Sequence, residues 1–173
     1  MANRKTKILL DADVIIHFSK GECLSKLPEI LPEYEFAVLD KVYNEILSVQ
    51  KQLDMQIHFL NNITLIDFST VSQEVKREYA LLTDFFGSGE SACMAYCRYY
   101  QDVVGSNNTK DVTDYCEKHD IVYLTTHDFL YLAYKRGKMT AKECTDFMKL
   151  VTAKGSRGCP VIDITKYTFK KNI

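Results

Sequence analysis

Four acidic residues in this 173-residue chain are spaced so that they could hold a metal ion together. Each follows a predicted strand or opens a predicted helix: Asp11, Glu45, Glu90 and Asp111. An α/β sheet gathers side chains from such positions into one cleft beyond the carboxyl ends of its strands. Several carboxylates in one cleft suit Mg²⁺ or Mn²⁺, which are hard ions that prefer oxygen ligands. The pattern therefore predicts a divalent-metal site.

Asp11 carries the most weight among these acids. The run Lys7-Ile-Leu-Leu reads as a buried strand that enters Asp11 and Asp13 directly and then continues as an apolar helix. Buried charges are costly unless they are paired, hydrated or bound to a cation. The alternative for a strand-end acid is that it only caps the following helix. We keep both interpretations open for Asp13, which is a second-tier candidate ligand.

Three more residues form a second tier of candidate ligands. Asn108 belongs to a Ser-Asn-Asn run after the strand predicted over 101–106. Asp114 lies one helical turn after Asp111, on the same face. Asp128 follows the strand predicted over 121–125 and either supports the site from behind or caps the next helix.

Short β-rich runs alternate with longer amphipathic segments throughout the chain. This alternation predicts an α/β fold in which parallel strands are joined by helices. We expect strands at 6–10, 35–38, 63–67, 101–106 and 121–125, and a weaker one at 160–164.

The expected helices have their own start signals. Asp40 is placed to cap a helix that carries Glu45 and continues through an apolar period to about residue 53. Ser88 is placed to cap a helix with Glu90 in its first turn. Residues 140–143 form a capping-box pattern, and the helix that follows them is expected to serve packing only.

The composition is that of an ordinary globular protein. With 46% hydrophobic and 26% charged residues, residues 1–173 are most simply one domain. No apolar run approaches the roughly 20 residues that span a bilayer. The N-terminal residues lack the apolar stretch of a signal peptide. We therefore expect a cytoplasmic protein without a membrane association.

The six cysteines allow two interpretations. A zinc site could use Cys93, Cys97, Cys116 and His119, but structural zinc sites usually show tighter ligand pairs. Most of the cysteines lie in periodic apolar stretches, so reduced thiols in the core are the better interpretation.

Charge is distributed unevenly along the chain. Residues 1–134 hold 12 Lys or Arg against 20 Asp or Glu, whereas residues 135–173 hold 10 against 3. A basic segment beside an acidic metal cleft suits a polyanionic substrate, because Lys and Arg hold phosphates while cations mask the carboxylates. The alternative is a solubilising basic edge. With a divalent ion, such a cleft would be suited to hydrolysing phosphodiesters.

The motifs resemble, over nearly the whole chain, those of the PIN-domain nucleases, which include VapC-like toxins. The resemblance rests on Leu10-Asp11-Ala12-Asp13, Val42-Tyr-Asn-Glu45-Ile, Gly87-Ser-Gly-Glu90-Ser-Ala and Val103-Val-Gly-Ser-Asn-Asn-Thr-Lys-Asp111. It implies a three-layer α/β/α sandwich with a mostly parallel central sheet. It also implies a ribonuclease that uses Mg²⁺ or Mn²⁺, often as a homodimer and often as the toxin paired with an antitoxin protein.

The resemblance carries metal-ligand roles onto Asp11, Glu45 and Glu90. Many members of the family have an acidic pair after the fourth strand, where this chain has Asn107 and Asn108. Asp111 matches another form of the motif, in which Asp follows Asn by three residues.

Two rival interpretations remain open. The strand that ends in Asp11-Ala12-Asp13 also resembles haloacid-dehalogenase-like phosphatases, in which Asp11 would be the nucleophile and Asp13 the acid/base. That interpretation needs a later acidic pair for Mg²⁺ and leaves Glu45 and Glu90 unexplained. The second rival is a PIN-like scaffold without turnover that binds RNA or protein.

Overall fold

A computed structural model describes residues 4–173 and places five strands in one sheet, in the order β3-β2-β1-β4-β5. Every strand pair is parallel. The strands are β1 (Lys7–Leu10), β2 (Glu35–Leu39), β3 (Thr64–Ile66), β4 (Val103–Gly105) and β5 (Tyr123–Leu124).

The three middle strands are apolar because helices cover both faces of the sheet. Ile8 of β1 is aligned with Phe36 of β2 on one side and with Val103 of β4 on the other. All three of these side chains are buried. A strand buried on both faces needs a continuous apolar run rather than an alternating one, which is the pattern in these segments.

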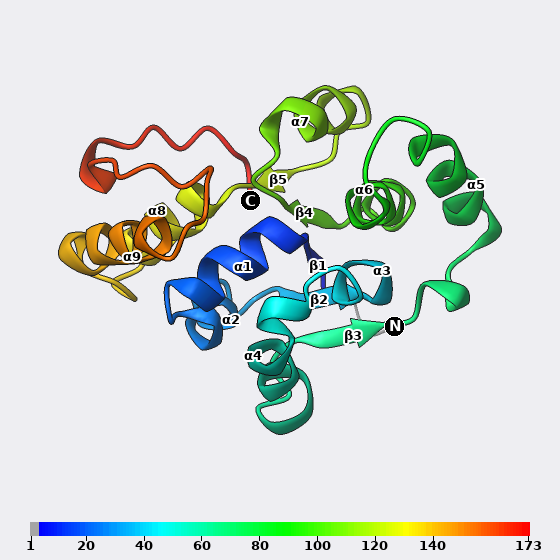
Figure 1. Cartoon of the computed structure of the whole chain (residues 1–173). Helices are drawn as coiled ribbons and strands as arrows, with labels where there is room; N and C mark the ends of the chain where they lie inside the picture. Colours follow the sequence, from blue (N-terminus) through cyan, green and yellow to red (C-terminus); the bar gives the residue numbers. More distant parts are fainter. Residues whose placement is uncertain (1–3) are drawn as a thin grey trace.

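Helices form a layer on each side of the sheet (Figure 1). α1, α2, α8 and α9 pack together on one side, and α5, α6 and α7 lie on the other. The fold is thus the three-layer α/β/α sandwich with a parallel central sheet that the sequence predicts. The helices are α1 (Ala12–Lys20), α2 (Leu27–Ile30), α3 (Asp40–Tyr43), α4 (Gln50–Asp54), α5 (Gln73–Leu82), α6 (Ser88–Tyr100), α7 (Thr109–Lys118), α8 (Thr126–Lys135) and α9 (Ala141–Ala153).

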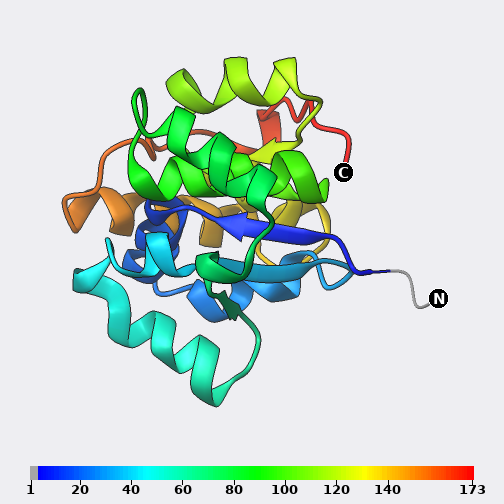
Figure 2. The same cartoon turned by 90° about the vertical axis from the view of Figure 1, so that its right-hand side faces the viewer.

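The order of the strands creates a crevice between β1 and β4. From β1 the chain passes through α1 and α2 to β2, whereas from β4 it passes through α7, on the other face, to β5. Loops that leave two adjacent strands toward opposite faces part at the carboxyl ends of those strands, and this is where α/β sheets bind ligands. Figure 2 shows β1 pointing toward this edge of the sheet, with the C-terminal end of the chain on the opposite side.

Aromatic packing joins the layers on the α1 side of the sheet. The ring of Phe18 on α1 lies 6.1 Å from Phe129 on α8 and 4.9 Å from Phe147 on α9, measured between centroids. Burying a phenylalanine fully contributes about 1.5–3 kcal/mol. These contacts fix α1, and with it the acids at its start, against the sheet.

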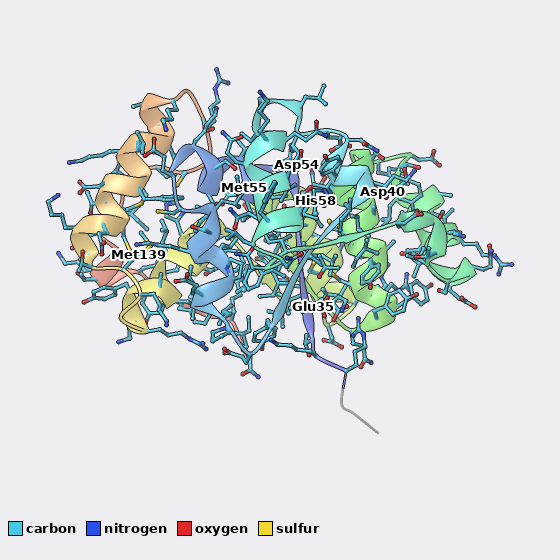
Figure 3. The ribbon with its side chains drawn as sticks, turned by 90° about the horizontal axis from the view of Figure 1, so that it is seen from below. Glu35, Asp40, Asp54, Met55, His58 and Met139 are labelled. Carbon is cyan, nitrogen blue, oxygen red and sulfur yellow. The ribbon has the colours of Figure 1, made fainter. Side chains whose placement is uncertain are left out.

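Two segments differ from the sequence prediction. The strand predicted at 160–164 does not form: residues 160–163 are irregular, and a 3₁₀ turn begins at Ile164 and ends at Lys166. The helix expected to begin at Asp40 is broken into α3, a 3₁₀ turn at Leu47–Val49, α4 and a π-helical turn at Met55–Phe59. Its apolar residues are buried as predicted, but β-branched residues at the break lower the preference for a continuous helix. Figure 3 labels Asp40, which follows β2 at the start of this segment, and Asp54, Met55 and His58 toward its C-terminal end.

Helix caps are partly as predicted. Thr140 and Glu143 form the expected capping box at the start of α9. α6 has Gly87 rather than Ser88 as its N-cap, because the Ser88 hydroxyl bonds to Tyr79 instead, at 2.8 Å.

The cysteines lie in the core as free thiols, apart from the half-buried Cys23. No helix within residues 4–173 has both the length and the apolar character needed to cross a membrane.

Candidate functional site

Asp11 lies at the carboxyl end of β1, in the crevice beside β4. Its backbone N–H donates to the carbonyl of Gly105 at 2.8 Å, which extends the β1–β4 pairing by one residue. Its Oδ1 accepts the N–H of Ala12 at 2.8 Å, and its Oδ2 accepts the Ser106 hydroxyl at 3.1 Å. The side chain is only 7% exposed. Asp11 therefore caps α1 with one oxygen and faces the loop after β4 with the other.

Asp13 links α1 to the loop after β4 through hydrogen bonds. Its Oδ1 accepts the N–H of Val14 at 2.6 Å, and its Oδ2 accepts the N–H of Asn107 at 2.9 Å. Both carboxylate oxygens thus hold backbone amides. This arrangement fixes the geometry of the loop, and it disfavours the acid/base role that the phosphatase interpretation gives to Asp13.

Glu45 contacts the start of α6, the helix that carries Glu90 in its first turn. Glu45 lies in the turn after α3, and its Oε1 accepts the backbone N–H of Gly89 at 2.9 Å. This amide is one of the first N–H groups of a helix, which have no partner inside the helix and attract negative charge. A Cβ at position 89 would lie 2.7 Å from Glu45 Oε2, so glycine at this position lets Glu45 keep its contact with the helix. The break in the predicted helix after α3 is what brings Glu45 to α6.

Glu90 has a buried carboxylate oxygen that accepts no hydrogen bond from the described residues. It is 9% exposed, and its Oε1 is buried without a hydrogen-bond partner among residues 4–173. Such atoms are rare in folded proteins, because an unpaired buried acceptor loses its hydration without compensation.

Asp111 lies half-buried in the first turn of α7, and its Oδ2 accepts the side-chain amide of Asn108 at 2.9 Å. Asp114, one turn later, is exposed.

Asp128 is held apart from these acids by hydrogen bonds of its own. Its Oδ2 accepts the backbone N–H and the hydroxyl of Thr125, and its Oδ1 accepts the Tyr167 hydroxyl at 2.9 Å. Asp128 thus caps α8, as the second of its two interpretations proposes.

The acids act on one another electrostatically. Burial, together with the charges of Asp13 and Glu45, raises the pKa of Asp11 from 3.8 to about 7. Burial, together with repulsion from Asp11 and Asp111, raises the pKa of Glu90 from 4.5 to about 8. The electrostatic coupling thus runs from Glu45 to Asp11, from Asp11 to Glu90 and from Glu90 to Asp111.

The described part of the chain contains no group of three or more His, Cys, Asp or Glu side chains that could hold a metal ion as placed. Several of the carboxylates are turned toward backbone amides or hydroxyls instead, as at Asp11 and Glu45. The kind of donor nevertheless fits a hard divalent cation, because all the candidates are oxygens. The orphaned Oε1 of Glu90 and the mutual repulsion of the acids are the features that such an ion would relieve.

A hydrogen-bond network behind the cleft has no signal in the sequence. His17 is buried in α1, and its Nε2 lies 2.8 Å from the carbonyl oxygen of Arg157. A carbonyl only accepts, so Nε2 carries the proton and Nδ1 accepts from the Thr126 hydroxyl at 2.8 Å. Burial lowers the pKa of His17, which keeps the ring neutral. Asn107 extends the network, since its Oδ1 accepts the N–H of Thr126 and its amide donates to the carbonyl of Gly158.

Comparison with known proteins identifies the fold and not the family. No protein-family model matches the chain, and no curated protein matches it. Among solved structures the chain is similar to one in the crystal structure of VapBC2 from Rickettsia felis bound to a DNA fragment from their promoter. The identity is 14% and the TM-score 0.50, over 69% of this chain and 98% of that one. The fold is PIN-like. This likeness supports the three-layer architecture that the sequence motifs imply.

Proposed function

We propose that this protein is a metal-dependent ribonuclease that hydrolyses RNA phosphodiester bonds in the acidic cleft. The observation that carries the proposal is the group of acids with raised pKa values beside the carboxyl ends of β1 and β4, on a PIN-like fold. Acids whose pKa values are raised by burial and mutual repulsion are characteristic of functional sites.

Asp11, Glu45, Glu90 and Asp111 would hold Mg²⁺ or Mn²⁺. Side-chain rotation at Asp11 and Glu45 would free oxygens that now accept protein hydrogen bonds. The bound ion would supply electrophilic stabilisation of a phosphodiester and lower the pKa of a nearby water.

The chain's own residues position this set of acids. Ser106 and the Ala12 amide orient Asp11, and the Gly89 amide orients Glu45. Asp13 holds the loop after β4, so its role in the proposal is structural support of the site. Loss of one of the metal-binding acids should reduce cleavage more than it harms the fold.

We also infer that the protein acts as the toxin of a toxin–antitoxin pair. The support is the likeness to a chain of the VapBC2 complex. A small antitoxin protein that co-purifies with this chain and suppresses its cleavage would support this inference. We propose a homodimer on the same ground of resemblance, and sedimentation would measure it.

One observation favours a second candidate, a PIN-like scaffold that binds RNA or protein without turnover. Where many PIN nucleases have an acid, Asn107 uses its side chain to tie Thr126 and Gly158 together. A residue used in this way supplies structure rather than a metal ligand.

The test is cleavage of a mixed pool of labelled RNA by the purified protein with Mg²⁺, with Mn²⁺ or with EDTA, beside a DNA pool. The critical variant is Asp11→Asn. The matched control is Asp120→Asn, which also removes one negative charge, at an exposed site between α7 and β5 whose left-handed backbone suits Asn. Metal-dependent RNA cleavage that only Asp11→Asn abolishes would support the nuclease. Absence of cleavage by the folded protein with either metal would favour the scaffold.

A further inference from the structure

After α9 the chain passes beside the acidic cleft in a short segment, residues 157–160, whose backbone is bonded to α1, α8 and the loop after β4. Three of its carbonyls accept bonds from three different elements. The carbonyl of Arg157 accepts from His17 on α1, that of Gly158 from Asn107 after β4, and that of Pro160 from His127 on α8 at 2.9 Å. Figure 2 shows this orange segment on the side toward which β1 points.

Local features hold the backbone of this segment in one conformation. Gly155 and Gly158 have positive φ angles of 80° and 81°, which glycine adopts without strain. A Cβ at position 158 would lie 2.9 Å from the Asn107 side-chain nitrogen. Cys159 is buried in the core and anchors the segment from within.

The pinned backbone leaves the Arg157 side chain free. Arg157 is exposed and forms no salt bridge within the described residues, whereas Lys154 before it pairs with Glu22 at 2.7 Å. Its backbone is close to the acids, because Asn107, which binds the next residue's carbonyl, also donates its backbone N–H to Asp13. The guanidinium thus extends from a backbone held beside the loop that binds Asp13, and within the described residues it forms no ion pair with the acids of the cleft.

We propose that Arg157 binds a backbone phosphate of single-stranded RNA that enters the cleft, and that segment 157–160 is built to hold it there. The proposal rests on the proposed function for the identity of the substrate. Guanidinium matches phosphate geometry with two parallel hydrogen bonds, and a position fixed by three contacts reduces the entropy lost on binding. Because the contact is to phosphate, it positions the RNA in the cleft but gives no preference for one RNA sequence over another.

The experiment measures binding and does not require turnover. A fluorescent single-stranded RNA oligonucleotide is titrated with the Asp11→Asn protein in Mg²⁺ at several salt concentrations, and anisotropy is recorded. Arg157→Ala is compared with Lys138→Ala, which removes one exposed positive charge at the end of α8 away from the cleft. Both changes are at exposed side chains, so the fold should survive, and circular dichroism checks this.

Arg157→Ala should weaken binding by about tenfold, the low end for a charge-assisted hydrogen bond at an exposed site. It should also make the slope of log K against log salt shallower by about 0.7, the amount for one phosphate contact on a single strand. Arg157→Lys should keep the slope and lose part of the affinity. Lys138→Ala should change neither quantity by a comparable amount.

Equal effects of Arg157→Ala and Lys138→Ala would overturn the proposal, as would an absence of RNA binding at low salt that the parent protein in Mg²⁺ shares. These outcomes are separate from failure of the nuclease. If the protein with Asp11 intact cleaves RNA but Arg157→Ala binds RNA normally, only the role of Arg157 is wrong. If Arg157→Ala weakens binding but no cleavage occurs in any metal, the binding site stands and the nuclease fails.

Discussion

Replacing Asp11 by Asn should make the metal-free protein more stable at neutral and alkaline pH. In the folded chain, burial and the charges of Asp13 and Glu45 raise the pKa of Asp11 to about 7. The folded state therefore holds the proton more tightly than the unfolded state does. The cost of ionising Asp11 is absent below pH about 4, grows as the pH rises, and is fully developed above pH about 7. An asparagine never ionises and avoids this cost.

The size of the effect follows from the shift. The pKa of Asp11 rises from 3.8 to about 7, which is about three pKa units. The free energy of unfolding is therefore lower by about 4 kcal/mol at pH 8 and by about 2 kcal/mol at pH 5 than it would be without this shift. These values are upper bounds, because Asp13 and Glu45 supply part of the shift and can take up protons themselves. Asparagine keeps an oxygen that can accept the Ala12 N–H, and the Ser106 hydroxyl can turn to accept from its amide, so the cap of α1 should persist.

The assay is urea unfolding of both proteins in EDTA at pH 5 and pH 8, followed by circular dichroism. We expect Asp11→Asn to be the more stable protein at pH 8, with a smaller gain at pH 5. A variant that is less stable than the parent at pH 8, or a gain that does not depend on pH, would refute the claim that Asp11 carries an unneutralised buried charge.

Three further predictions concern the start of α6, Glu90 and the cap of α8. Gly89→Ala places a Cβ 2.7 Å from Glu45 Oε2 and should displace the Glu45 side chain. We expect RNA cleavage to fall strongly while the thermal unfolding temperature changes little. Normal cleavage by this variant would show that the position of Glu45 is unimportant. Saturating Mg²⁺ should raise the unfolding temperature of the parent protein and raise it much less in Glu90→Gln, and equal shifts would place the ion elsewhere. Asp128→Ala removes the carboxylate half of the capping box of α8, while the Thr125 hydroxyl can still accept the N–H of residue 128. The variant should be less stable by about 1–3 kcal/mol in urea unfolding, with Mg²⁺ still stabilising it. Loss of the Mg²⁺ effect would make Asp128 part of the ion site.

The sheet was predictable from the sequence because its strands are continuous apolar runs. Burial on both faces requires such runs, and Lys7–Leu10 and Glu35–Leu39 lie within a residue of the predicted ranges. The segment at 160–164 is also apolar, but its carbonyl at Pro160 is bonded to His127 rather than to a strand. A local sequence pattern does not show that a backbone carbonyl will accept its hydrogen bond from a distant side chain instead of from a neighbouring strand.

The grouping of the acids followed from topology, whereas their orientation did not. Asp11 follows β1 directly, so its place at the sheet edge could be read from the chain. The contact between Glu45 and Gly89 depends on a break in the predicted helix after α3. The network that brings Arg157 to the cleft joins α1, α8 and two loops, and no spacing in the sequence encodes it.

The central claim is that the acidic cleft binds a divalent ion, and binding of Mn²⁺ tests it most directly. The free-ion signal of Mn²⁺ in electron paramagnetic resonance is recorded during titration with the protein at pH 8, where Asp11 is largely ionised. We predict loss of the free-ion signal with at least one Mn²⁺ bound per chain, and a much weaker loss with Asp11→Asn. An unchanged signal with the folded parent protein, or equal binding by both proteins, would contradict the account.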